Sequence, residues 1–149
     1  MKDLINKIKS SLHLSQEAEA FLYSISKEKT LSKGEVLISQ GQAVRKTFFV
    51  TEGCLRSYCV DKNGREHTLL FAIKGWWISD YIAVHTDELA TLTVECLAKS
   101  KVVEFNAKEL DGIHARFPEF ESYQRHNLER HVVSLHRRIL SQLQLSASE

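Results

Sequence analysis

The sequence predicts a mainly β fold with flanking helices, in which short strands form an antiparallel sandwich or barrel. Three observations predict this class. The middle of the chain holds at least six short runs rich in β-branched and aromatic residues, one Asn-Gly pair marks a tight hairpin, and both ends have helical periodicity. The chain has 149 residues, which is the size of one domain that buries a core without metal or disulfides.

The first 25 residues predict two short amphipathic helices. Within residues 2–12, the apolar side chains that fall on one helical face are Leu4, Ile5, Ile8 and Leu12. Ser15 is a suitable N-cap for the second helix, because its hydroxyl can accept a hydrogen bond from a free N–H of the first turn. The apolar residues that then repeat the helical spacing are Ala18, Phe21, Leu22 and Ile25.

The strands are expected from Thr30 onward, where Gly, Asn, Asp and Lys separate short apolar runs. These runs are EVLIS (35–39), TFFV (47–50), LRSYCV (55–60), HTLLFA (67–72), TLTVECL (91–97) and KVVEF (101–105). Residues 58–70 predict a hairpin, since Asn63 and Gly64 both tolerate the positive φ of a tight turn. Strands of this number and length are typical of an antiparallel sandwich or barrel.

The helical pattern returns at Asn106, which is expected to cap a short helix over residues 106–113. Pro118 suits the first turn of a much longer helix over residues 118–145. Steps of four and three there predict the seam of a two-stranded coiled coil, formed by Leu128, Val132, Leu135 and Ile139. A second apolar stripe consists of Val133, Leu140 and Leu143. One stripe is expected to meet the domain and the other a partner copy; the alternative is that both pack within the chain.

Charge and cysteine content favour a soluble cytoplasmic protein. The formal net charge is +1, so no overall attraction to nucleic acid or to an acidic membrane is expected. Cys54, Cys59 and Cys96 form no CxxC pair, which predicts free, partly buried thiols in a reducing compartment. The N-terminus lacks the apolar run of a signal peptide, and no segment approaches the ~20 apolar residues needed to cross a bilayer.

No pattern in the sequence predicts a metal site or an enzyme. Histidines recur every five residues in the long helix, at His126, His131 and His136, and this spacing turns each by about 140° from the last. HxH, HExxH and GxxxxGK motifs and a nucleophile elbow are all missing. The same helix concentrates Arg125, Arg130, Arg137 and Arg138. A solvated face beside the seam is favoured for these arginines over a surface for nucleic acid.

Lys33 to Trp77, KGEVLISQGQAVRKTFFVTEGCLRSYCVDKNGREHTLLFAIKGWW, resembles the cyclic-nucleotide-binding domain of the Crp/Fnr superfamily of transcription regulators. Phe49 and Val50 ahead of Gly53 resemble its strand-turn signature, and Arg56 follows as in some relatives. The glycines that match the family's turns are Gly34, Gly41, Gly53, Gly64 and Gly75. The likeness implies a cyclic-nucleotide-binding-like β-roll, a double-stranded β-helix of the jelly-roll type. It assigns residues 1–117 to a sensor domain with N-terminal helices and 118–145 to a dimerisation helix.

The resemblance also places a ligand site after Gly75. In the family, a Gly-Glu pair opens a short helix whose N–H groups face the cyclic phosphate, and an Arg-Ser or Arg-Thr pair further along supplies positive charge. Here Ser79-Asp80 replaces the first pair, and the arginine position falls at or near Leu92; no arginine lies between Arg65 and Arg116. A buried phosphate needs a cation, so cyclic AMP binding of the usual kind is not expected.

A different small ligand stays open, and the cofactor is left unassigned. By resemblance, the ligand-binding residues would be Ser79, Asp80, Thr91, Leu92 and Thr93. Trp76 or Trp77 would supply an aromatic wall, although ordinary structural roles are favoured for both, with one in the core and one at the surface. No metal ligand is assigned among these residues.

The resemblance implies the sensor and dimerisation domain of a Crp/Fnr-type transcriptional regulator. The homodimer would form through the long helix, with Leu128, Val132, Leu135 and Ile139 at the interface. DNA would be bound only through a helix-turn-helix domain, which in the family follows the long helix and is not found after Leu145. The alternative is a free-standing small-ligand-binding or interaction module unrelated to transcription. No membrane partner is expected.

Overall fold

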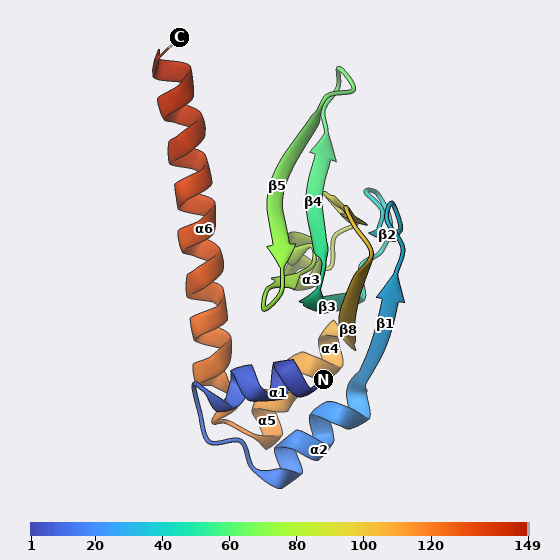
Figure 1. Cartoon of the computed structure of the whole chain (residues 1–149), viewed down its shortest axis with the longest axis vertical. Coiled ribbons are helices and arrows are strands. Elements are labelled where there is room, and N and C mark those ends of the chain that lie inside the picture. Colours follow the sequence, from blue (N-terminus) through green and yellow to red (C-terminus); the bar gives the residue numbers. More distant parts are fainter. Residues whose placement is uncertain (149) are drawn as a thin grey trace.

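The computed structural model describes residues 1–148, with side chains described as far as Leu145. Two sheets are flanked by helices, and the long C-terminal helix stands beside them (Figure 1). In chain order the elements are α1 (Lys2–Lys9), α2 (Gln16–Ile25), β1 (Ser26–Leu31), β2 (Val36–Ile38), β3 (Lys46–Glu52), β4 (Cys54–Val60), β5 (Glu66–Ile73), β6 (Trp77–Ile78), α3 (Tyr81–Thr86), β7 (Thr93–Cys96), β8 (Ser100–Asn106), α4 (Ala107–Asp111), α5 (Ile113–Arg116) and α6 (Phe120–Ser148).

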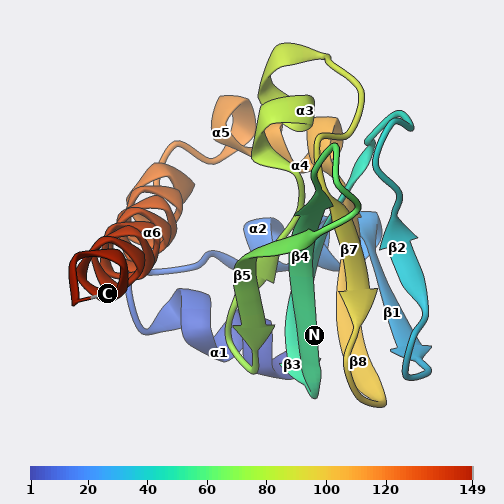
Figure 2. The ribbon, with the colours of Figure 1, turned by 90° about the horizontal axis from the view of Figure 1, so that it is seen from above.

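The two sheets are antiparallel and have four strands each. Their strand orders are β1-β8-β3-β6 and β2-β7-β4-β5. Seen from above, the sheets lie face to face, and α6 lies outside them next to the edge strand β5 (Figure 2). This arrangement confirms the predicted mainly β fold of the jelly-roll type with a long C-terminal helix.

The central strands β3 and β8 of the first sheet are buried on both faces, because their residues alternate between two hydrophobic clusters. In β3, Phe48 and Val50 point into the space between the sheets, while Phe49 points to the helices on the opposite face. Neighbouring residues of β8 divide in the same way, with Val102 between the sheets and Val103 under the helices. This double burial explains why both strands are nearly continuous apolar runs in the sequence.

Two of the predicted helix caps are confirmed. The Ser15 hydroxyl accepts a hydrogen bond from the Ala18 N–H at 3.1 Å, at the start of α2. The Asn106 side chain accepts from the N–H groups of Lys108 and Glu109, at 3.0 and 3.1 Å. Both caps satisfy free N–H groups of a first helical turn, which is why a local sequence signal located them correctly.

The β4–β5 hairpin is confirmed, but the predicted role of Asn63 in its turn is wrong. Gly64 has a φ of +78°, whereas Asp87 is the only non-glycine with positive φ among residues 1–148. The Asp61 carboxylate instead holds the turn by accepting from the N–H groups of Asn63 and Arg65, at 2.8 and 3.0 Å. A single left-handed residue therefore suffices, as in hairpin loops longer than two residues.

Gly53 occupies the most restrictive turn. Its φ is +94°, and an added Cβ would lie 2.2 Å from the Ser100 Oγ and 2.7 Å from the Lys99 carbonyl oxygen. Gly53→Ala is expected to lower the free energy of unfolding by about 2–3 kcal/mol, measured by urea denaturation. Gly64→Ala is the matched control, since Gly64 also has positive φ but nothing within 4 Å, and a loss of about 1 kcal/mol is expected there. Equal losses at the two positions would contradict the steric argument.

Candidate functional site

The Asp80 carboxylate is the centre of the site that the resemblance identifies. The side chain is fully buried, with 0% exposure, at the start of α3. Its Oδ1 accepts a hydrogen bond from the Ala83 N–H at 3.0 Å and so caps the helix. Its Oδ2 accepts three more: from the Thr91 N–H at 2.6 Å, the Thr91 hydroxyl at 2.9 Å and the Leu92 N–H at 3.0 Å. The donors that converge here therefore already hold an anion, and it belongs to the chain itself.

The five residues assigned to a ligand do lie together, around α3 and the start of β7. They are Ser79, Asp80, Thr91, Leu92 and Thr93. The two hydroxyls outside the Asp80 cluster also have partners within the chain. The Ser79 hydroxyl donates to the Lys46 carbonyl at 2.8 Å, and the Thr93 hydroxyl oxygen accepts from the Gln40 N–H at 3.2 Å. These groups serve the fold, and ligand binding by the five residues stays a prediction.

No cation compensates Asp80 among the residues whose side chains are described, since none forms an ion pair with it. Arg56, which follows the family's strand-turn signature, is held elsewhere. Its guanidinium donates to the carboxylates of Glu95 and Glu66, both at 2.7 Å, and it lies 4.0 Å from the centre of the Tyr58 ring. The hydrogen bond to Glu66 is the main cause of the raised pKa of Arg56. This arginine is therefore fully paired and does not replace the missing one.

A buried polar contact joins α3 to α6. The Tyr81 hydroxyl hydrogen-bonds Nε2 of His131 at 3.2 Å, and the Trp76 ring meets the same imidazole edge-on at 5.4 Å. His131 is only 5% exposed, and burial, with the nearby charges of Arg130 and Lys7, lowers its pKa to about 4. Burial raises the pKa of Tyr81. Both groups are therefore neutral near pH 7 and link the helix that follows Asp80 to the long helix.

The two tryptophans have different environments. Trp77 is 4% exposed, packs against Phe49 at 5.3 Å between ring centres, and donates its indole N–H to the Tyr123 hydroxyl at 2.7 Å. The favoured structural role is confirmed for Trp77. Trp76 is only partly buried, and the Arg130 guanidinium lies 4.0 Å from its ring centre.

A cavity of about 80 Å³ adjoins the junction of α3, α4 and α6. Ser79 lines it, together with Trp77, Tyr81, Tyr123 and Asn127, whereas Asp80, Thr91, Leu92 and Thr93 do not. Pockets that hold drug-sized ligands usually measure ~300–1,000 Å³. A cyclic nucleotide therefore does not fit this cavity unless α6 moves away from the roll.

Both apolar stripes of α6 are exposed, which contradicts the alternative that both pack within the chain. Exposure is 49% for Leu128, 52% for Val132 and 51% for Ile139, and Leu135 is partly buried. The second stripe is exposed as well: Val133, Leu140 and Leu143. The expectation that one stripe meets the domain is also wrong, because the face that does so carries Phe120, Tyr123, His131 and Arg138.

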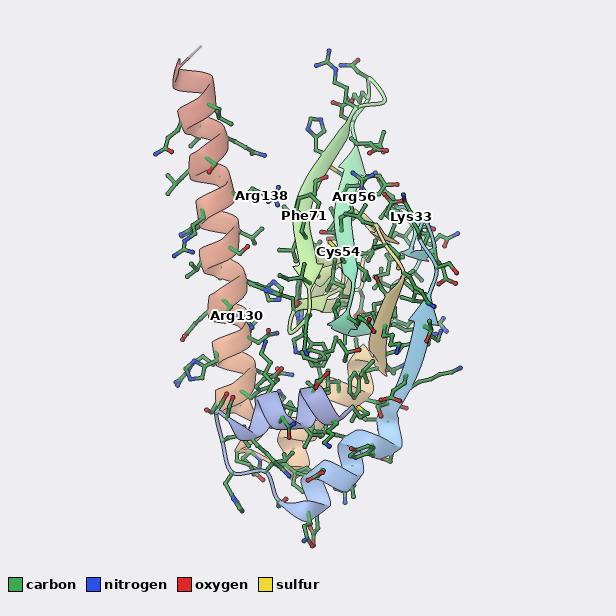
Figure 3. All side chains as sticks on the ribbon, in the orientation of Figure 1. Lys33, Cys54, Arg56, Phe71, Arg130 and Arg138 are labelled. Atoms are coloured by element: carbon green, nitrogen blue, oxygen red, sulfur yellow. The ribbon has the colours of Figure 1, made fainter. Side chains whose placement is uncertain are left out.

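Sequence reasoning also misplaced two of the four arginines. Arg130 and Arg138 are partly buried and face the domain rather than solvent. Arg138 lies 5.1 Å from the centre of the Phe71 ring, across the space between α6 and β5 (Figure 3). Arg125 fits the expected solvated face, since it pairs with Glu129 at 3.7 Å and both are exposed. Helical spacing could have separated the two arginines that face the domain from the two that face solvent only if the side of α6 that meets the domain had been known.

Comparisons with known proteins identify the family. The model of the cyclic nucleotide-binding domain family matches residues 28–117, which is more than half of the chain. A search of curated proteins gave no match.

Similar solved structures include the catabolite activator protein of Thermus thermophilus, at 16% identity and a TM-score of 0.66. The alignment covers 90% of this chain and 61% of that protein. The heme domain of CooA from Rhodospirillum rubrum has 21% identity and a TM-score of 0.65, and the alignment covers 88% of this chain and 92% of that domain. The N-terminal domain of a transcriptional regulator from Streptomyces coelicolor A3(2) has 21% identity and a TM-score of 0.59. Here the alignment covers 91% of this chain and 86% of that domain. The chain belongs to the cyclic nucleotide-binding domain family, and these structures share its fold.

Proposed function

We propose that this chain is the sensor and dimerisation domain of a Crp/Fnr-type transcriptional regulator, and that it does not bind cyclic AMP in the family's usual way. It is a binding protein and not an enzyme in this proposal. The observation that carries the ligand part is the buried Asp80 carboxylate, which accepts four hydrogen bonds from the helix α3 and from Thr91 and Leu92. A cyclic phosphate at the same donors would meet a carboxylate, and a close pair of like charges with no cation is unfavourable.

The regulator part is supported by the proteins that share the fold. Two of them are described as a catabolite activator protein and a transcriptional regulator. This chain spans 61% of the length of the Thermus thermophilus catabolite activator protein, so the activity of a whole regulator is part of the proposal. Among residues 1–148, no helix has the length and apolar character needed to span a bilayer. A cytoplasmic location is likewise part of the proposal.

Dimerisation through α6 is supported by the apolar surface of that helix. Leu128, Val132 and Ile139 are each about half exposed, although a monomeric helix would normally turn such residues inward. Their spacing with Leu135 is that of a two-stranded coiled coil. A second copy of the same helix is therefore the occupant that we assign to this surface, and its test is given in the Discussion.

Isothermal titration with cyclic AMP and cyclic GMP tests the ligand part. We expect no saturable heat at millimolar nucleotide, because the donors of the site are already bound to Asp80. A micromolar dissociation constant for either nucleotide would contradict the proposal.

The coding sequence immediately downstream of Glu149 separates the regulator from the alternative. We expect it to encode a helix-turn-helix domain, since that is the module which reads the major groove in regulators of this type. A stop codon directly after Glu149 would instead favour a free-standing ligand-binding or interaction module.

A further inference from the structure

Two cations share one backbone carbonyl where α1, α6 and the turn before β6 meet. The Lys7 ammonium and the Arg130 guanidinium both donate to the Gly75 carbonyl oxygen, the latter at 3.3 Å. Neither cation forms an ion pair with an Asp or Glu among the residues whose side chains are described. Lys29, which is also partly buried, pairs by contrast with the buried Glu104 at 2.9 Å. Two positive charges therefore lie close together without a counter-charge.

The surroundings strengthen the electrostatic effect of the pair. Lys7 and Arg130 are both partly buried, with the ammonium 5.8 Å from the Phe49 ring centre and the guanidinium 4.0 Å from that of Trp76. Burial, and then the charge of Arg130, lowers the pKa of Lys7 to about 8. An ammonium has three N–H donors and a guanidinium five, and a carbonyl can accept only one from each. Donors therefore remain for a further acceptor.

A surface hollow of about 450 Å³ lies beside Arg130 and Trp76. Arg137, His126 and Glu129 also line it, whereas Lys7 does not. Glu129 is the one carboxylate in this lining, and it interacts with Arg125 and His126 at 3.7 and 3.8 Å rather than with Arg130. In Figure 3, Arg130 lies on the lower half of α6 and Arg138 above it. The hollow thus offers an aromatic wall next to positive charge.

We propose that this hollow binds a small organic anion, whose carboxylate or phosphate group meets the Arg130 guanidinium and whose apolar body lies against Trp76. The Lys7 ammonium, which shares the Gly75 carbonyl with Arg130, adds a second positive charge behind it. An anion there supplies the missing counter-charge and accepts the free donors, which are charge-assisted and therefore strong. The site differs from the one around Asp80, because neither Lys7 nor Arg130 contacts the five residues of that site. It joins α1 to α6 and does not depend on the regulator proposal.

Benzoate and phenyl phosphate are suitable probes, titrated at constant ionic strength with chloride as the reference anion. Binding is measured by calorimetry and by tryptophan fluorescence, and the two probes distinguish a carboxylate ligand from a phosphate ligand. We expect saturable binding of at least one probe to the wild type and at least about tenfold weaker binding to Lys7→Met and Arg130→Gln. Lys2→Met and Arg125→Gln are the matched controls, since both are exposed on the same two helices, and they should bind like the wild type. Equal binding by all four variants, or no binding beyond that of chloride, would overturn the proposal.

The pH dependence of benzoate binding to the wild-type protein tests the same site without any substitution. Lys7 interacts with Arg130 and His131 of α6, while β3 presents Phe49 and the turn presents the Gly75 carbonyl. The hollow also presents His126, Glu129 and Arg137. Between about pH 7.5 and pH 9.5 the group next to Arg130 that titrates is Lys7, since its pKa is about 8 and that of His131 about 4. Affinity should be highest below pH 8 and fall above it, as the ammonium loses its proton. A constant affinity over this range would count against the site.

Discussion

Replacing Asp80 by alanine is expected to lower the free energy of unfolding by about 4 kcal/mol or more. The substitution leaves three backbone N–H groups and one hydroxyl without an acceptor, of which the Ala83 N–H is buried and the donors of Thr91 and Leu92 are partly buried. Each buried donor that loses its partner costs about 1–3 kcal/mol. It also removes the N-cap of α3, a helix of only six residues that has little other stabilisation of its own.

Urea denaturation followed by circular dichroism measures this loss. Glu88→Ala is the matched control, because Glu88 is an exposed carboxylate in the loop that follows α3, and it should change stability by less than about 0.5 kcal/mol. A double-mutant cycle of Asp80→Asn with Thr91→Val then isolates the contact between Oδ2 and the Thr91 hydroxyl. A loss for Asp80→Ala no larger than that of the control would show that the carboxylate does not hold this segment together.

The role of Asp80 explains how the family's ligand site can persist in shape without its usual ligand. The acidic residue lies next to the start of the short helix, as the resemblance implied, and it accepts hydrogen bonds from Thr91 and Leu92, which directly precede β7. A bound phosphate would need the N–H groups of the short helix, one of which, that of Ala83, already donates to Asp80. The carboxylate thus ties α3 to the segment that leads into β7, a connection that in a ligand-gated site would form only when the ligand is present.

The sequence was sufficient wherever a local signal determines the structure. The caps at Ser15 and Asn106 and the left-handed turn at Gly64 each depend on residues within a few positions of one another. It was insufficient for β1, whose SKEKTL segment has few apolar residues because one side of this edge strand faces solvent. It also missed the two-residue strand β6, whose pairing with β3 depends on long-range contacts rather than on its own length.

In the candidate site, too, the sequence revealed which residues are present but not the contacts that they form. The sequence, through the resemblance, brought Asp80, Thr91 and Leu92 to one place and recognised that no arginine follows. It did not reveal that these groups satisfy one another, because hydrogen bonding between residues 11 and 12 positions apart depends on how the intervening loop folds. Nor could it show that Arg130 and His131 face the domain, since the apolar stripes of this helix lie on other sides and the face that meets the domain is polar in sequence.

Replacing both Leu135 and Ile139 by aspartate is expected to convert the proposed dimer into monomers. Each dimer would carry four aspartates in a seam that otherwise buries apolar side chains, and burying a polar group there costs about 1–3 kcal/mol. A total of ~4 kcal/mol or more weakens dimerisation at least about a thousandfold. The fold of each copy should survive, because Ile139 is already 51% exposed in the single chain and Leu135 is only partly buried.

Sedimentation equilibrium at tens of micromolar protein measures the change, with a melting curve to verify folding. Ser141→Asp with Gln144→Asp is the matched control, since it adds the same charge at exposed positions of the same helix outside the seam. Leu140→Asp with Leu143→Asp tests the second stripe, whose residues are 56% and 61% exposed. If the dimer survives the substitutions at Leu135 and Ile139 but is lost with those at Leu140 and Leu143, the interface is formed by the second stripe. A wild-type chain that is monomeric at this concentration would remove the proposal of a dimer through α6, because a coiled-coil seam of this length has to associate if it is the interface.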